Sequence, residues 1–167
     1  MSLHLLLIRH AKSDWSDPRL PDHERPLNPR GRRDAPRMGA WIAAQGYAPQ
    51  EVLCSDALRT RQTLALMLPL WAPPPEVSYH RALYHATPEA MLAVLEGASA
   101  SRVALIGHNP GIGQLMARLA RQAPAHPRWG DVPTCAVAAL SFDAPDWFAI
   151  REGTGRLEAF AVPADLA

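Results

Sequence analysis

The sequence predicts a single α/β domain, a three-layer α/β/α sandwich built around a mostly parallel central sheet. Two observations lead to this fold class. Short apolar runs alternate along the chain with segments whose apolar residues recur every three or four positions, which is typical of alternating strands and helices. The 167 residues are enough for one domain with its own core, so we expect the whole chain, 1–167, to fold as one unit.

The expected strands are apolar runs bounded by polar or turn residues. We expect buried strands at 3–9, 51–54 and 102–106 and a weaker strand at 77–80. In the last third of the chain we expect strands at 135–142 and 147–152, and the segment near 157–162 is a candidate for a third. The stretch 1–9 is too short to span a membrane and is interpreted as a strand rather than a signal segment.

The expected helices begin at recognisable start signals. Asn28-Pro29 gives an N-cap followed by proline in the first turn, and the helix that follows ends near Gly46. A second helix is expected at 57–68, a third from Thr87-Pro88 to about residue 96, and a fourth at 112–121. The polar, proline-containing stretch 10–27 is expected to be a loop.

Composition excludes several classes of function. A net charge of +1 argues against a nucleic-acid-binding surface, and no spacing typical of zinc ligands or of a nucleotide-binding glycine loop is present. We therefore expect no metal, no cofactor, no nucleic acid and no membrane. Cys54 and Cys135 lie in apolar segments, which fits buried, reduced thiols in a cytoplasmic protein better than a disulfide.

Chemically suggestive residues follow three of the expected strands. The first strand ends at Arg9-His10, the second at Ser55 with Arg59 one helical turn later, and the strand at 102–106 at Gly107-His108. Carboxyl ends of parallel strands lie along one edge of a sheet, so two arginines and two histidines are expected to meet there. Two guanidinium groups suit a phosphoryl dianion, one imidazole can attack phosphorus, and the other can stabilise its oxygens. The attacking imidazole needs an acceptor for its other nitrogen, and a backbone carbonyl is the expected partner.

These motifs resemble, in order, those of the histidine phosphatase (phosphoglycerate-mutase-like) superfamily, and more closely its small SixA-type branch of phosphohistidine phosphatases. The resemblance runs from about residue 3 to about residue 142. The matching stretches are Leu7-Ile8-Arg9-His10-Ala11-Lys12-Ser13, Arg25-Pro26-Leu27-Asn28, Ser55 to Thr63, Leu83-Tyr84 and Ile106-Gly107-His108-Asn109-Pro110.

The resemblance implies a phosphoglycerate-mutase-like fold and a role for each matching residue. His10 would be the nucleophile that becomes phosphohistidine, Arg9 and Arg59 would clamp phosphate, and His108 would be the second imidazole. The substrate would be a phosphohistidine-bearing protein, and no metal would be needed. The sequence leaves the particular partner protein and the oligomeric state open.

The sequence offers no clear general acid. Larger members of the superfamily place a carboxylate in mid-chain, where this chain reads Arg81 to Glu89, so Glu89, His85 and Asp14 are the available candidates. A phosphohistidine leaving nitrogen can already carry a proton, so the lack of an acid favours phosphohistidine over a sugar phosphate.

Several alternatives remain open. Arg61 could replace Arg59, and Ser55 could bind phosphate or cap a helix. Ser13, beside Lys12, could line the site or belong to a solvated loop, and Arg25 could reach substrate or form a structural ion pair. A phosphomonoesterase acting on a small metabolite and a non-catalytic phosphate-binding module are the rival functions.

Overall fold

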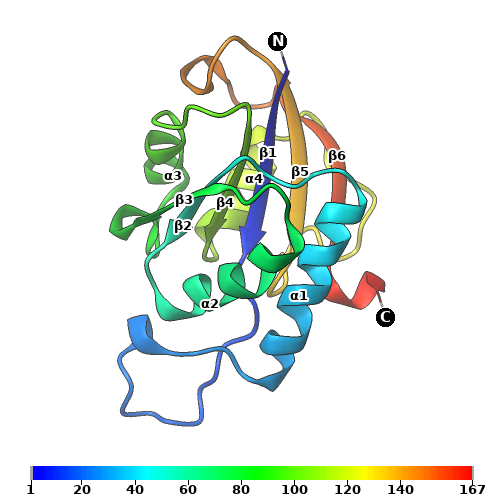
Figure 1. The fold of residues 1–167 in the computed structure, drawn as a ribbon. Coiled ribbons are helices and arrows are strands. Elements are labelled where there is room, and N and C mark those ends of the chain that lie inside the picture. The colour runs from blue at the N-terminus through cyan, green and yellow to red at the C-terminus, as the bar shows by residue number, and fades with distance from the viewer. Residues whose placement is uncertain (1, 167) are drawn as a thin grey trace.

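The computed structural model describes residues 2–166. A six-stranded sheet runs through it in the order β3-β2-β4-β1-β5-β6 (Figure 1). The strands are β1 Ser2–Arg9, β2 Glu51–Ser55, β3 Glu76–His80, β4 Arg102–Gly107, β5 Val137–Asp143 and β6 Arg156–Ala161. The helices are α1 Pro29–Ala44, α2 Leu58–Met67, α3 Pro88–Leu95 and α4 Gly111–Leu119. β1, β2, β3 and β4 pair in parallel, whereas β5 runs antiparallel to β1. β6 pairs antiparallel with β5 and so points the same way as β1, and the predicted mostly parallel α/β fold is confirmed.

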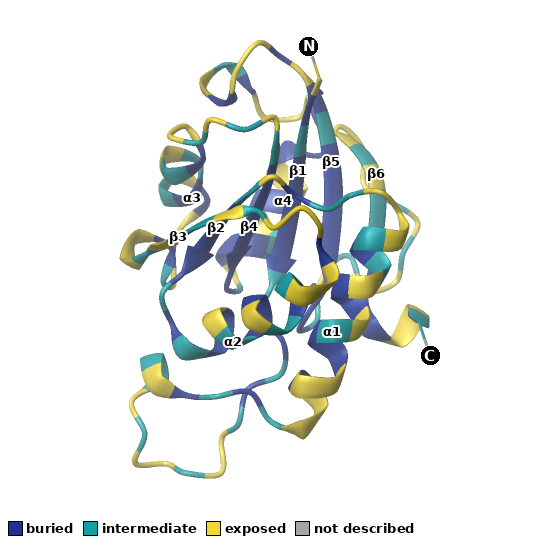
Figure 2. Ribbon diagram, viewed as in Figure 1, coloured by how far each residue is buried: buried dark blue, intermediate teal, exposed yellow. Residues whose placement is uncertain are grey.

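The alternation of side chains along β1 supplies both cores. Leu5 and Leu7 pack into one cluster with residues of α3 and α4, whereas Leu6 and Ile8 pack into the other with residues of α1 and α2. A buried parallel strand has apolar residues on both faces because helices cover both sides of the sheet. Figure 2 shows the consequence, since the central strands are buried along their length while the outer faces of the helices are exposed.

The predicted start signals act as helix caps. The Asn28 side chain accepts a hydrogen bond of 2.8 Å from the Gly31 amide at the start of α1, and Thr87 accepts one of 3.2 Å from the Ala90 amide at the start of α3. Each satisfies an amide that the first helical turn leaves without a partner. The residue after the C-cap of α1 is Gly46, whose φ of 78° is a conformation glycine adopts readily.

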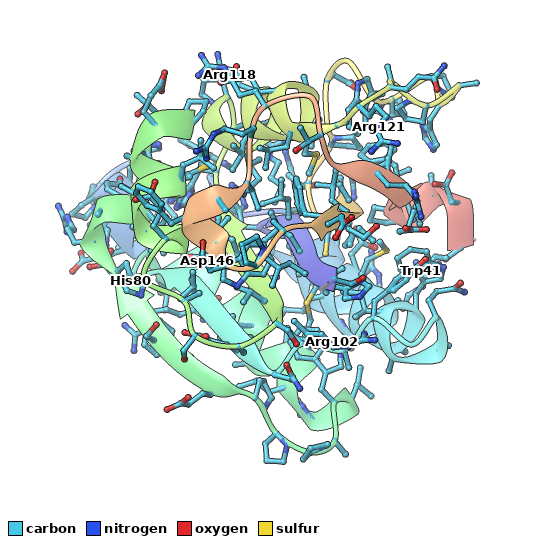
Figure 3. The ribbon with its side chains drawn as sticks, turned by 90° about the horizontal axis from the view of Figure 1, so that it is seen from above. Trp41, His80, Arg102, Arg118, Arg121 and Asp146 are labelled. Carbon is cyan, nitrogen blue, oxygen red and sulfur yellow. The ribbon has the colours of Figure 1, made fainter. Side chains whose placement is uncertain are left out.

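The prediction of a strand at 147–152 is wrong. Trp147–Ala149 forms a short 3-10 turn after Asp146, which is labelled in Figure 3, and the last strand is β6. The Asp146 side chain accepts a hydrogen bond of 2.9 Å from the Ala149 amide, and the Trp147 indole donates one of 2.7 Å to the Ala100 carbonyl. The buried Trp147 therefore anchors a turn over the core.

Among residues 2–166, no helix combines the length and the apolarity needed to cross a membrane.

Candidate active site

A hollow of about 200 Å³ lies where the parallel strands β1 and β4 end and the loop after β1 begins. The register pairs Arg9 with Gly107 at the ends of β1 and β4, which brings His10 and His108 beside each other just beyond the sheet. Their ring centroids are 5.3 Å apart. The hollow is lined by Arg9, His10, Lys12, Ser13, Trp15, Asp22, Arg59, His85, His108, Asn109 and Thr134. The two arginines and two histidines singled out from the sequence thus line one space.

His10 is buried and its backbone is held on both sides. Its amide donates to the Gly107 carbonyl at 3.1 Å, and its carbonyl accepts from the Cys135 amide at 2.9 Å. Its Nδ1 lies 2.7 Å from the Ala11 carbonyl oxygen. A carbonyl can only accept, so Nδ1 carries the proton and Nε2 keeps its lone pair.

The electrostatic environment keeps His10 neutral. Burial, reinforced by the positive charges of Arg59 and Arg9, lowers the pKa of His10 to about 3. An uncharged imidazole with a free lone pair at neutral pH is the form that can attack an electrophile.

His108 is oriented by Ser55 at the end of β2. Its Nε2 forms a hydrogen bond of 2.8 Å with the Ser55 hydroxyl, and the same oxygen accepts a longer bond of 3.4 Å from the Ala57 amide before α2. Burial, with the neighbouring His10 and the charge of Arg59, lowers the pKa of His108 to about 2. Its buried Nδ1 has no hydrogen-bond partner among the described residues. Ser55 does not line the hollow, and the N-cap position of α2 is Ala57, without a side-chain cap, so Ser55 neither faces a ligand directly nor caps α2; its hydroxyl contacts His108 and the Ala57 amide instead.

The two arginines of the hollow are held differently. Arg9 donates to the Val132 carbonyl at 3.0 Å, while its buried Nε has no partner within residues 2–166. Arg59 donates to the carbonyl and to the carboxylate of Asp22, at 2.7 Å and 2.9 Å. Arg61 lies instead over the ring of Tyr79, outside the hollow, so the structure places Arg59 and not Arg61 in the site.

Asp22 is a residue of the hollow that the sequence analysis missed. Its Oδ2 accepts hydrogen bonds from the Tyr84 hydroxyl at 2.6 Å, from Arg59 at 2.9 Å and from His85 Nε2 at 3.0 Å. Burial alone would raise the pKa of Asp22, but these hydrogen bonds outweigh it and hold that pKa far below its usual value. Asp22 belongs to a loop with several other acidic residues and no motif, so only the fold distinguishes it from its neighbours.

Of the three acid candidates, only His85 lines the hollow. Glu89 is exposed and accepts a hydrogen bond of 2.8 Å from Arg118. Asp14 accepts from the Ser16 amide at 2.7 Å in the loop after β1. Neither Glu89 nor Asp14 is among the lining residues.

Ser13 and Arg25 both contact Trp15. Ser13 lines the hollow, and its hydroxyl oxygen accepts a hydrogen bond of 3.0 Å from the Trp15 indole nitrogen. Arg25 is buried, does not line the hollow, and places its guanidinium 4.1 Å from the Trp15 ring centroid. Its Nε is 3.8 Å from Asp22 Oδ1, which is the structural ion pair that the sequence analysis left open as an alternative.

The family of the chain follows from comparison with known proteins. A model of the histidine phosphatase superfamily (branch 1) matches residues 5–83. An uncharacterized protein of Mycobacterium tuberculosis is 36% identical over 163 residues, which cover 93% of this chain and 99% of that protein. The chain belongs to the histidine phosphatase superfamily.

Solved structures indicate which branch of the superfamily this chain resembles. A candidate phosphohistidine phosphatase SixA from Nakamurella multipartitia superposes with a TM-score of 0.82 at 28% identity, over 98% of this chain and 97% of that one. A candidate SixA from Agrobacterium tumefaciens gives a TM-score of 0.77 at 25% identity, over 96% and 98%. The resemblance to the SixA type and the phosphoglycerate-mutase-like fold are thereby confirmed.

Proposed function

We propose that this protein is a phosphohistidine phosphatase that removes the phosphoryl group from a phosphohistidine on a phosphotransfer protein, through a covalent intermediate on His10. The observation that carries the proposal is the burial, protonation state and hydrogen bonding of the His10 imidazole. Its imidazole is buried and neutral, its Nδ1 is bound to a carbonyl, and its Nε2 is left free in a hollow that Arg9 and Arg59 also line. The similarity to SixA-type structures supports the same chemistry.

The first step transfers the phosphoryl group to His10. The Nε2 lone pair forms a bond to phosphorus while the bond between phosphorus and the substrate nitrogen breaks, and that electron pair leaves with the substrate ring. A substrate imidazole protonated on its other nitrogen leaves as a neutral ring and needs no acid. Arg9 and Arg59 neutralise the charge on the phosphoryl oxygens, and the unpartnered Nδ1 of His108 is available to the same group.

The second step returns His10 to its starting state. Water attacks phosphorus, the bond to Nε2 breaks, and its electron pair returns to the ring. The water oxygen remains on phosphorus, and the product leaves as dihydrogen phosphate, which loses a proton to solvent. Nδ1 keeps its proton throughout because it donates to the Ala11 carbonyl, so the lone pair reappears on Nε2 for the next cycle.

The rim of the hollow suits a phosphorylated side chain carried by a protein. Trp15 and His85 line the hollow and are both exposed, so its mouth lies at the molecular surface. Cys54 and Cys135 are buried free thiols, which supports a reducing compartment such as the cytoplasm for both enzyme and partner.

One observation favours a second activity, the hydrolysis of a small phosphomonoester. An alkoxide is a poor leaving group and needs a proton. Asp22 cannot donate one because it stays ionised, but His85, which Asp22 contacts at 3.0 Å, is an imidazole at the mouth of the same hollow. If esters are substrates, His85→Asn slows ester hydrolysis much more than phosphohistidine hydrolysis, because only the ester requires the proton.

The experiment is phosphate release from a phosphohistidine-bearing phosphotransfer protein. Wild type is compared with His10→Ala and with His4→Ala, in which the changed histidine lies near the start of β1, the strand that His10 follows. We expect release by wild type and by His4→Ala and none by His10→Ala. Faster release from small phosphomonoesters than from the phosphoprotein would replace the first function with the second. Binding of phosphate without release from either substrate would indicate a passive phosphate-binding module.

A further inference from the structure

Trp15 is a large aromatic residue that is exposed to solvent at the mouth of the hollow. Its side chain belongs to the loop between β1 and α1, is 60% exposed, and lines the same space as His10 and Arg59. The loop projects beyond the sheet below β1 in Figure 1, at the end where the parallel strands stop. A tryptophan with this exposure adds little to the core, and its place in the lining of the hollow leaves its ring open to a ligand bound there.

The ring is held in place on one edge and one face. Its indole nitrogen donates to Ser13, which is itself buried, and Arg25 lies over the ring with its guanidinium carbon 4.1 Å from the centroid. Arg25 is buried in turn and donates to the Asp17 carbonyl at 3.3 Å. An exposed ring of this kind would otherwise change rotamers freely. Here two buried residues fix it while most of its surface stays open.

This arrangement gives Ser13 and Arg25 an indirect part in the site. Each was a candidate to contact substrate, yet Arg25 does not line the hollow, and the Ser13 hydroxyl oxygen accepts a hydrogen bond from the indole. Their common contact is Trp15. Both residues therefore position an aromatic surface at the mouth of the hollow, and Arg25 does so without lining the hollow itself.

We propose that Trp15 is a stacking platform for the leaving group, the planar imidazole of the phosphohistidine substrate, while the phosphoryl group lies among Arg9, His10 and Arg59. The proposal rests on the proposed function, since it concerns the ring from which the phosphoryl group is taken. Offset or edge-to-face stacking between an indole and a second ring is favourable. A protonated imidazole gains a further cation–π attraction. Stacking would select planar ring leaving groups over aliphatic amines and alcohols, so Trp15 would determine specificity without taking part in bond making.

Three substrates separate this role from others. They are a phosphohistidine-bearing protein, free phosphohistidine, and the inorganic phosphoramidate ion, whose leaving group has no ring. The variants are Trp15→Ala, Trp15→Phe, which retains a ring, and Phe148→Ala. Phe148 is a matched control because it is 68% exposed and lies in the turn after β5, away from the residues of the hollow.

We expect Trp15→Ala to lower kcat/KM about tenfold on both ring-bearing substrates, which is the size of one stacking contact. Turnover of phosphoramidate should stay within about twofold, because the phosphoryl contacts are unchanged. Trp15→Phe should restore most of the loss, and Phe148→Ala should behave as wild type on all three substrates.

Each other outcome overturns the proposal in a distinguishable way. An equal loss on phosphoramidate means that Trp15 only supports the hollow through Arg25. A loss on the phosphoprotein alone means that Trp15 contacts the partner protein and not the phosphorylated ring. An unchanged kcat/KM on every substrate would mean that Trp15 does not stack on the leaving group, while the proposed function would stand. Failure of wild type to release phosphate from either phosphohistidine substrate overturns the proposed function and the platform together.

Discussion

The neutral state of His10 and His108 predicts a specific sensitivity of folding to acid. Their pKa values are lowered to about 3 and about 2, whereas a histidine in the unfolded chain titrates near about 6.5. As the pH falls below about 6.5, the unfolded chain binds protons that the folded protein excludes. The stability contributed by neutral burial is therefore complete above that pH and is lost progressively as the pH falls toward the folded pKa values.

The size of the effect follows from this difference. For one histidine that titrates only in the unfolded state, lowering the pH from about 7 to about 5 reduces the free energy of unfolding by about 2 kcal/mol. The two histidines together contribute about 4 kcal/mol. His10→Asn keeps a side chain that can donate to the Ala11 carbonyl but removes the titrating group. The variant should therefore lose about 2 kcal/mol less than wild type over the same interval.

The assay is urea unfolding of wild type and His10→Asn at both pH values, in buffer free of phosphate so that no anion occupies the site. Other titrating groups are common to both proteins, so the difference between the two pH dependences isolates His10. Equal losses for wild type and variant would refute the reasoning. They would mean that His10 binds a proton near pH 6 in the folded protein and is not a neutral nucleophile there.

Two further substitutions test the geometry around the hollow. Asp22→Asn removes a negative charge that faces Arg59, so inorganic phosphate should inhibit several-fold more strongly; weaker inhibition would mean that Asp22 acts chiefly by aligning Arg59. Ser55→Ala leaves both nitrogens of His108 without a hydrogen bond from any residue of 2–166. We therefore expect kcat to fall with little change in KM, and the free energy of unfolding to drop by about 1–3 kcal/mol. An unchanged kcat, measured by steady-state phosphate release, would argue against His108 acting in the transition state.

The parts of the fold that the sequence predicted are those with a repeating local signal. Leu5 and Leu7 face one core and Leu6 and Ile8 the other, so the uninterrupted apolar run marked a strand covered on both sides. The caps at Asn28 and Thr87 likewise act within three residues of their own position in the chain. Because parallel strands end at one edge, the same reasoning brought the residues after β1 and β4 together.

The parts that the sequence did not predict depend on contacts between distant segments. The triple hydrogen bonding of Asp22 joins residues separated by 37 to 63 positions along the chain. The strand expected at 147–152 is replaced by a turn because Trp147 bonds to Ala100, 47 positions away. Neither contact leaves a periodic trace in the sequence, and both follow from where the sheet places its neighbours.

The measurement that tests the central claim most directly is the identification of the covalent intermediate. Wild type would be mixed with a phosphohistidine-bearing protein, quenched rapidly in alkali, where phosphohistidine survives, and mapped by peptide mass spectrometry. We predict a single phosphoryl group, located on His10 in the peptide that joins β1 to the loop after it. The group should be absent from His10→Ala. Turnover with no phosphoryl group on His10, or with the group on His108 or another residue, would contradict the account.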